Sequence, residues 1–291
     1  MKPKLLIVGS MSYSIATYDD GARERFGGGV SYGGKAAASL GISATIVTIG
    51  AEDIEPGVQD LKSAGIDILR IRRNSSNNFS NDYRGKLRKL QMRSYIKEPF
   101  LNDDFLKVPK SDAIVFFPGL HEISPEILDI FKDRIIFLDV GGLTRKLGER
   151  NDEGFYPIFQ GLWENINDFR GKVDILKVSE EDLENTKEKA EDLVENGFPV
   201  VLLTRGERPT VLFQKDKSPI EVSVFSVEGG DTAGAGEVFS IGFTYEYLLT
   251  KDLVKAVAFG NTCASCKIAG EDYTYEKAKK RADEILNFSN S

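Results

Sequence analysis

The stretch of sequence that decides the fold begins with Glu221-Val222-Ser223-Val224-Phe225-Ser226-Val227, and it continues after Glu228 into Gly229-Gly230-Asp231-Thr232-Ala233-Gly234-Ala235-Gly236-Glu237. The first part predicts a strand over Glu221–Val227, because apolar residues alternate along it. Two glycines then make a turn, and Asp231 and Thr232 are good helix N-caps before a helix predicted over 233–249. A strand that turns directly into a helix is the repeating unit of an α/β fold.

The same alternation of strands and helices extends over most of the chain. Short, β-branched apolar runs predict further strands at Leu5–Val8, Thr45–Ile49, Ala113–Phe117, Ile135–Val140, Asp174–Val178, Val200–Leu203 and Val211–Phe213. Helices are predicted at Val30–Leu40, Pro125–Phe131, Gly154–Asn165, Glu180–Asn196, 251–268 and 274–288. This order predicts an α/β fold with a mostly parallel central sheet flanked by helices, in a single domain over residues 1–291.

Two regions interrupt the alternation. Residues 11–26 are polar, and residues 67–96 combine alternating polar and apolar residues with Asn and Gly turns. This pattern is typical of hairpin strands that have one solvated face, so the two regions predict a small β-lid beside the main sheet. Because an exposed lobe of this kind can pair edge to edge, a homodimer through the β-lid is one expectation.

The composition excludes several classes of function. The 291 residues include 45 acidic and 38 basic side chains, a formal net charge of −7, so we expect no nucleic-acid partner. No apolar run approaches 18 residues, and we expect no membrane span. Two cysteines argue against a disulfide scaffold and favour a cytoplasmic location. The single histidine, His121, rules out a zinc site built on several histidines, and we expect it in an exposed loop rather than lining a site.

The glycine-rich helix start has the composition of an anion-binding site. The first N–H groups of a helix point outward with the positive end of its dipole, and the small residues Ala233, Gly234, Ala235 and Gly236 leave them accessible. Glu237 follows within the first turn and could accept a proton from a hydroxyl group. Such a pairing suits phosphoryl transfer to an alcohol. The alternative is a capped turn in which Glu237 is only a favourable charge at the helix start.

The run Asp231-Thr232-Ala233-Gly234-Ala235-Gly236-Glu237-Val238-Phe239 closely resembles the C-terminal signature of the ribokinase/PfkB family of carbohydrate kinases, Asp-Thr-x-Gly-Ala-Gly-Asp-x-Phe. The resemblance implies a three-layer ribokinase-like fold with a β-lid, and transfer from ATP, with Mg²⁺, to a small polyol, sugar or nucleoside. It also implies Glu237 as the general base and the N–H groups of Ala233–Gly236 as the anion hole.

Glu237 stands where the family has Asp. The extra methylene moves the carboxylate by about 1 Å, and a misplacement of that size can cost on the order of 10²-fold in rate. The alternative to a working kinase is therefore a catalytically weak or silent ligand-binding protein on the same fold.

Other segments extend the resemblance towards the substrate. Phe26–Leu40 is similar to the family's N-terminal Gly-Gly element, and Tyr32, in place of Asn, looks like the branch acting on inositol-like polyols. Asn81-x-Tyr83-x-Gly85-x-x-Arg88 resembles the lid element of that branch. Ser14 stands in place of the family's sugar-gripping Asp, for which Asp19 and Asp20 are possible substitutes. The substrate-binding residues implied are Ser12, Ser14, Gly28, Tyr32, Arg88 and Asp231.

The remaining similar segments concern the phosphoryl donor. Ile175–Asp182 resembles the segment that holds phosphates and metal, which implies Lys177 and Ser179 as cofactor-binding residues and Asp182 as the metal ligand. Val201–Gly206 resembles the nucleotide-side strand and turn, which implies Thr204 and Gly206, and the helix containing Asn261 resembles the one beside the adenine.

Three other motifs have different readings. Gly29–Ala36 nearly spells a phosphate-binding P-loop, but Ala36 lacks the hydroxyl that would hold magnesium. Cys263-Ala264-Ser265-Cys266 lies in a helix of small residues, so packing is favoured over a redox or metal site. The cluster Arg70, Arg72 and Arg73 is expected on a solvated strand face, with contact to an anionic substrate in the β-lid as the alternative.

Overall fold

The computed structural model describes residues 2–82, 84, 89–161, 163–183 and 185–289. A nine-stranded sheet forms the centre of the chain, in the order β15-β14-β13-β12-β9-β8-β1-β4-β5. Its strands are β1 (Lys4–Ser10), β4 (Ser43–Gly50), β5 (Asp67–Arg72), β8 (Ala113–Phe117), β9 (Ile135–Asp139), β12 (Ile175–Ser179), β13 (Val200–Arg205), β14 (Arg208–Gln214) and β15 (Ile220–Val222). All neighbours pair in parallel except at β13–β14 and β14–β15, which confirms the predicted mostly parallel sheet.

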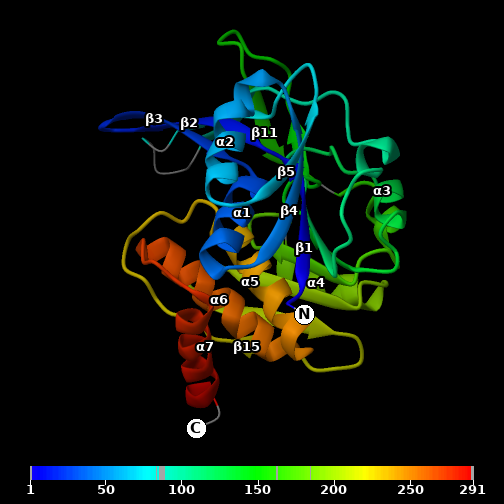
Figure 1. The fold of residues 1–291 in the computed structure, drawn as a ribbon, viewed down its shortest axis with the longest axis vertical. Coiled ribbons are helices and arrows are strands. Elements are labelled where there is room, and N and C mark those ends of the chain that lie inside the picture. Colours follow the sequence, from blue (N-terminus) through cyan, green and yellow to red (C-terminus); the bar gives the residue numbers. More distant parts are fainter. Residues whose placement is uncertain (1, 83, 85–88, 162, 184, 290–291) are drawn as a thin grey trace.

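Helices cover both faces of this sheet (Figure 1). One face packs against α1 (Gly29–Leu40), α2 (Glu55–Ser63), α5 (Ala235–Thr250), α6 (Leu253–Ala269) and α7 (Tyr275–Ser289), and the other packs against α3 (Pro125–Asp129) and α4 (Thr186–Glu195). Successive residues of β1 show why: Leu5 and Ile7 point into the first core, whereas Leu6 and Val8 point into the second. No helix in the described part of the chain is long and apolar enough to cross a membrane.

A second, six-stranded sheet stands beside the main one, in the order β10-β11-β7-β6-β2-β3. Its strands are β2 (Ser12–Tyr18), β3 (Gly21–Gly27), β6 (Asn78–Asp82), β7 (Lys89–Ser94), β10 (Arg145–Leu147) and β11 (Tyr156–Gln160). We call this second sheet the lid sheet. The β2–β3 hairpin projects from the body of the molecule in Figure 1.

Several predicted boundaries were wrong, each for an identifiable reason. The helix predicted at Gly154–Asn165 is strand β11 followed by a short 3₁₀ turn at Ile166–Phe169. The β-lid predicted to begin at residue 67 begins later, because β5 pairs with β4 as the edge of the main sheet. The strand predicted over Glu221–Val227 stops at Val222, since side chains of α6 replace a partner strand beyond it. The helix predicted at Glu180–Asn196 begins only at Thr186.

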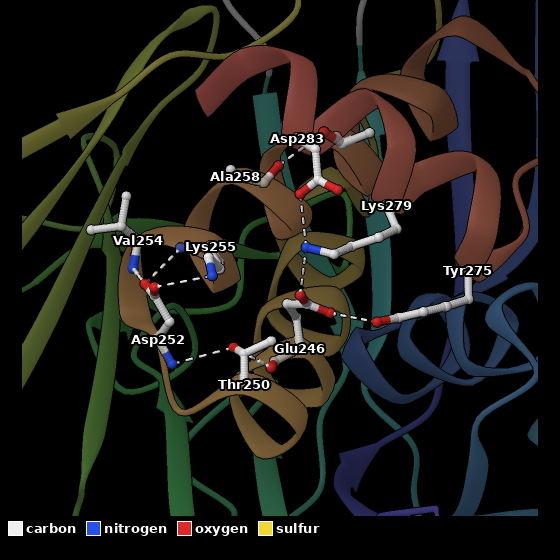
Figure 2. Close-up of polar contacts among 10 residues, drawn as sticks. Glu246, Thr250, Asp252, Val254, Lys255, Ala258, Tyr275, Lys279 and Asp283 are labelled. Atoms are coloured by element: carbon white, nitrogen blue, oxygen red, sulfur yellow. Dashed lines mark hydrogen bonds and ion pairs between the residues drawn. The ribbon is translucent and has the colours of Figure 1, made fainter. Parts of the chain in front are cut away.

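A buried carboxylate joins α5 to α7, the first and the last of the three C-terminal helices (Figure 2). Glu246 of α5 is fully buried, accepts a hydrogen bond of 2.9 Å from the Tyr275 hydroxyl, and lies 3.0 Å from Lys279 Nζ. Lys279 also pairs with Asp283 at 2.9 Å on its own helix. The N-cap Asp252 accepts from two N–H groups and begins α6 between these two helices. Glu246 therefore fixes α7 to α5.

We expect Glu246→Ala to lower the free energy of unfolding by about 3 kcal/mol, because it leaves Lys279 without its buried partner and Tyr275 without its acceptor. Urea denaturation together with limited proteolysis of α7 measures the effect. Glu246→Gln is the matched control, since an amide keeps an oxygen for Tyr275, and it should lose less. If Glu246→Ala unfolds at the same urea concentration as the wild type, Glu246 does not fix α7 to α5.

Candidate active site

A cavity of about 1010 Å³ lies between the lid sheet and the carboxyl ends of the central strands. Ligands of open α/β sheets bind at such strand ends. Fifteen of the residues predicted from the sequence line it: Ser12, Ser14, Gly28, Tyr32, Lys177, Ser179, Asp182, Thr204, Gly206, Ala233, Gly234, Ala235, Gly236, Glu237 and Asn261. Asp231 is not among the lining residues, and Arg88 lies outside the described residues.

The N-terminus of α5 forms one wall of the cavity. The helix begins at Ala235, and Gly234 before it has a φ of 81°. Local bonds already occupy two of the four predicted N–H groups: Ala233 N donates to Asp231 Oδ1 at 3.0 Å, and Ala235 N donates to the Thr232 carbonyl at 3.1 Å. Within the described residues, the N–H groups of Gly234 and Gly236 have no hydrogen-bond partner. The open part of the anion site is therefore narrower than the predicted Ala233–Gly236.

Gly234 leaves no room for a side chain, and a side chain at Gly236 would press against the end of Lys177. A Cβ at Gly234 would collide with the ring of Tyr32, and the positive φ disfavours any larger residue. A Cβ at Gly236 would lie 2.9 Å from Lys177 Nζ. The two glycines consequently let an aromatic ring and a cation approach the same helix end, from α1 and from β12 respectively.

A buried charge cluster faces this helix end. Lys177 Nζ donates to Asp139 Oδ2 at 2.8 Å, and only 8% of the Lys177 side chain and 12% of the Asp139 side chain are exposed. Asp182 Oδ2 accepts from Ser179 N at 2.7 Å. The other oxygens, Asp139 Oδ1 and Asp182 Oδ1, both lie beside Gly141, since a Cβ added to this glycine would be 3.4 and 3.5 Å from them, and Asp139 Oδ1 accepts from Gly141 N at 3.1 Å. The cluster thus places one ammonium group among carboxylates at the carboxyl ends of β9 and β12.

The pKa values of this cluster follow from its burial and charges. Burial, and then the charge of Asp139, raise the pKa of Glu237 above its ordinary value, although Lys177 and Arg145 act in the opposite direction. Burial also raises the pKa of Asp182. Burial alone would lower the pKa of Lys177, but the charges of Asp139 and Asp182 raise it, so this lysine stays protonated.

Asp231 has a structural position rather than one inside the cavity. Its carboxylate lies 3.5 Å from Arg25 NH1 on β3 and 3.4 Å from Lys267 Nζ on α6, and it caps Ala233 N. Arg25 also donates to the Tyr18 hydroxyl at 2.7 Å. The side chain predicted to bind substrate therefore joins the lid sheet to the loop that begins α5.

The far end of the cavity is built by α6 and the segment 223–227. Asn261 is buried, accepts from Thr210 Oγ1 at 2.7 Å, and donates to the carbonyls of Val222 and Ser223 at 3.1 and 3.0 Å. Ser265 Oγ donates to the Phe225 carbonyl at 3.0 Å. These bonds hold an apolar wall that consists of Val224, Phe225, Val227, Ala264 and Ile268.

Comparisons with known proteins agree with this geometry. Residues 146–278 match the family described as pfkB family carbohydrate kinase. The chain has a ribokinase-like fold and carries a pfkB-family region. The match to the bifunctional protein HldE of Marinomonas sp. (strain MWYL1) has 25% identity over 183 residues, which is 62% of this chain and 36% of that protein. This chain therefore matches about a third of that relative's length.

Solved structures share the fold over nearly their whole length. One is a pyrophosphate-dependent kinase in the ribokinase family, solved with a pyrophosphate analog and myo-inositol. It has a TM-score of 0.79 and 18% sequence identity, and the match covers 96% of this chain and 99% of that chain. The ribokinase of Arabidopsis thaliana, solved with ribose and ATP, has a TM-score of 0.72 and 18% identity, and covers 99% and 100%. The Methanocaldococcus jannaschii nucleoside kinase has a TM-score of 0.69 and 17% identity, and covers 98% and 100%.

The competing motifs lie inside helices α1 and α6. Gly29–Lys35 lies inside helix α1, where a phosphate-binding loop cannot form, and Lys35 pairs with Asp60 at 3.1 Å on the surface. Cys263 and Cys266 are free and buried in α6, as expected for packing residues. No cluster of three or more metal-ligating His, Cys, Asp or Glu side chains occurs among the residues that the structure describes.

The basic cluster and the histidine also lie apart from the cavity. Arg70 bonds to Glu55 and to the Ala51 carbonyl, and Arg73 bonds to Asp104. None of the three arginines lines the cavity. The expected solvated face is wrong for Arg70 and Arg73, whose side chains are only 8% and 10% exposed, and holds for Arg72, which is 76% exposed. His121 is exposed, as expected, and its Nε2 lies 2.6 Å from the Arg145 carbonyl.

Sequence reasoning missed several charged residues that line the cavity, among them Asp139, Arg25 and Arg145. Asp139 was detectable, because it ends a predicted buried strand and polar residues at the carboxyl end of a parallel strand face the ligand site. Arg145 follows the same strand by six residues and begins β10. The position of Arg145 in the site was not predictable, because the segment before the predicted helix Gly154–Asn165 carried no strand prediction.

Proposed function

We propose that this protein is a kinase that transfers the γ-phosphoryl group of ATP to a hydroxyl of a small polyol, sugar or nucleoside. One observation carries the proposal: Glu237, the Lys177–Asp139 pair and the open N–H groups of Gly234 and Gly236 face one cavity. Phosphoryl transfer requires positioning and charge stabilisation more than covalent chemistry. The pfkB-family match over residues 146–278 supports the same reaction.

In the proposed mechanism, each residue acts at a stated atom. The Glu237 carboxylate accepts the proton of the acceptor hydroxyl as that oxygen attacks phosphorus. The N–H groups of Gly234 and Gly236 donate to the phosphoryl oxygens, and Lys177 Nζ, which lies beside Gly236, stabilises the negative charge of these oxygens. The lid sheet, fixed to the α5 loop through Arg25 and Asp231, excludes the water that would otherwise compete as acceptor.

The carboxylates present fit Mg²⁺. This ion is usually held by one or two carboxylates together with substrate phosphates and water. Asp139 and Asp182 each place one oxygen beside Gly141 at the edge of the cavity, and Asp182 is the ligand expected from the sequence. Magnesium bound there would neutralise charge on the donor phosphates.

ATP is the donor that the shape of the cavity favours. Beyond the α5 N-terminus the cavity continues along the apolar wall formed by Val224, Phe225 and Ile268, which suits a nucleotide base. Pyrophosphate, the donor named for one structural neighbour, would leave that wall uncovered.

Turnover by the purified protein tests the proposal. ATP and pyrophosphate are supplied separately with Mg²⁺ over a panel of polyols, sugars and nucleosides, and release of ADP or phosphate is measured. We expect acceptor-dependent ADP release. Tight binding of ATP or a polyol without any acceptor-dependent turnover would favour the silent ligand-binding protein instead.

The raised pKa of Glu237 gives a second test. A general base acts in its deprotonated form, so kcat/KM should fall as the pH falls through the pKa of this group. Because burial and Asp139 raise that pKa above the ordinary Glu value of 4.5, the acid limb should lie above pH 4.5. A pH profile of kcat/KM measures it. An acid limb at or below pH 4.5 would argue against Glu237 as the base.

A further inference from the structure

A buried carboxylate that has no part in the proposed mechanism lies close to the cavity wall. Glu122 follows β8, is only 1% exposed, and is not among the lining residues. Its Oε1 accepts from Ser10 N at 3.1 Å, Ser10 Oγ at 2.6 Å and Gly119 N at 2.7 Å, and its Oε2 accepts from Leu120 N at 2.6 Å. These donors replace the hydration that a buried carboxylate loses. Ser10 and Gly119 themselves line the cavity.

The loop that Glu122 holds has a strained backbone. His121, between Leu120 and Glu122, has a φ of 53°, in the left-handed region that disfavours residues other than glycine. A residue held there costs about 1 kcal/mol or more, and such strain is concentrated at functional sites. The hydrogen bonds from Gly119 N and Leu120 N to the Glu122 carboxylate stabilise the loop in this conformation. Glu122 therefore fixes a strained loop whose residues Pro118 and Gly119 form part of the cavity wall.

The network continues from Glu122 into the lid sheet. Asn77 is fully buried, and its Nδ2 donates to Ser10 Oγ at 2.8 Å while its Oδ1 accepts from Ile96 N at 2.9 Å. Asn77 comes directly before β6, and Ile96 comes shortly after the end of β7. One amide thus joins the two places where the chain enters and leaves the antiparallel β6–β7 pair, and Ser10 connects that amide to Glu122.

The β6–β7 pair carries part of the wall beneath the lid sheet. Phe79 and Asn81 of β6 and Leu90 of β7 line this half of the cavity, as do Ser12 and Ser14 of β2. Because β2 pairs directly with β6, a shift of β6 reaches β2 as well. The apolar wall at the other end of the cavity belongs to α6 and to the segment before α5. A change at Glu122 should therefore affect the half beneath the lid sheet first.

We propose that Glu122 is a positioning residue for the acceptor. Through Ser10 and Asn77 it fixes both ends of the β6–β7 pair, and thereby the wall against which the acceptor binds, without touching the substrate itself. The inference rests on the proposed kinase function, because it places the acceptor beneath the lid sheet, beside Ser12 and Ser14. Charge-assisted hydrogen bonds in a fully satisfied buried network hold one arrangement rigidly, which is what acceptor positioning requires.

Glu122→Gln tests the inference. The amide keeps the volume of the side chain, but one acceptor oxygen becomes an NH₂ group that faces other donors. The probe is the acceptor of the panel that has the highest kcat/KM with the wild type. We expect its KM to rise about 10- to 100-fold, whereas the KM for ATP changes less than about twofold. Initial rates at varied acceptor and at varied ATP concentrations measure the two constants.

Asn77→Ala perturbs the same network at another point, and it keeps the inference testable if Glu122→Gln does not fold. It removes the connection to the β6–β7 pair and leaves the four hydrogen bonds of Glu122 in place. The acceptor KM should rise again while the KM for ATP stays unchanged. In the double variant the rise should be smaller than the product of the two single effects, because both substitutions break one connection.

Glu246→Gln is the matched control, because Glu246 is also a fully buried carboxylate but lies in the C-terminal helices and does not line the cavity. It should leave both KM values unchanged although it lowers the stability. If both KM values rise together in Glu122→Gln, or if the acceptor KM rises in Glu246→Gln as well, Glu122 has a structural role only and the inference is overturned.

Hydrogen exchange separates this inference from the proposed function, since it needs no turnover. In Glu122→Gln the backbone amides of β6 and β7 should exchange about tenfold faster than in the wild type, while those of β13 keep their rates. Faster exchange confined to β6 and β7, in a protein that phosphorylates no acceptor, would support the network and reject the kinase. Turnover with an unchanged acceptor KM and unchanged exchange in the variant would reject the role of Glu122 and leave the kinase standing.

Discussion

Replacing Glu237 by Gln is expected to lower kcat by on the order of 10²- to 10⁴-fold, because the amide cannot accept the proton of the acceptor hydroxyl. ATP affinity should change little, since the donor half of the cavity is formed by other residues, among them Asn261 and Phe225. Steady-state turnover and equilibrium ATP binding measure the two effects. Glu228→Gln, an exposed glutamate in the loop before α5, is the control and should behave like the wild type.

The Glu237→Asp variant restores the aspartate that the carbohydrate-kinase signature has at this position, and it tests whether the longer side chain is adapted to the acceptor. If the longer side chain is matched to the position of the acceptor, shortening it should reduce kcat, because the carboxylate withdraws by about 1 Å. A gain in kcat would instead show that Glu237 is a handicap. Turnover unchanged in Glu237→Gln would contradict its role as the base altogether.

Replacing Lys177 by Met is expected to lower kcat on the order of 10²- to 10³-fold and to lower the free energy of unfolding by about 3 kcal/mol. The catalytic loss follows from removing the Lys177 ammonium group, which lies beside Gly236 at the N-terminus of α5. The stability loss arises because Asp139, Asp182 and Glu237 would face one another in a buried site without their ammonium partner. Turnover and urea denaturation measure the two effects separately.

A double variant distinguishes these two roles of Lys177. Lys177→Met combined with Asp139→Leu removes the uncompensated charge, so stability should largely return while activity stays low. If the single and double variants unfold at the same urea concentration, the ion pair does not account for the stability loss. If Lys177→Met keeps wild-type kcat, the lysine is a structural residue only.

The parallel sheet and most of its strands were predictable because their sequences are short, β-branched and bounded by turn residues. The helix predicted at Gly154–Asn165 was wrong, because the side chains there alternate with the period of a strand. Tyr156 and Ile158 in fact alternate into the apolar cluster beneath the lid sheet, and Phe159 between strand neighbours is exposed. A period of two was the available signal, and Pro157 masked it by suggesting a helix start.

The candidate site was predictable where a local motif determines the geometry. The glycines before Glu237 allow the close approach of Tyr32 and Lys177, and the motif shows these glycines directly. Arg145 and Asp139 were missed because their roles depend on which strand ends meet in space, a property of sheet order rather than of neighbouring residues. The ion pairs of Asp231 with Arg25 and Lys267 were not predictable either, because the motif does not show which elements meet it.

The bonded amide of Asn261 has a consequence for the choice of nucleoside triphosphate. Its oxygen accepts from Thr210 and its NH₂ group donates to the carbonyls of Val222 and Ser223, so this side chain has no N–H group left for the edge of a purine or pyrimidine. A base in the adjoining slot contacts chiefly the apolar surfaces of Phe225 and Ile268. Flat, hydrophobic contacts discriminate weakly among heterocycles, and GTP, ITP and CTP should therefore replace ATP with modest loss.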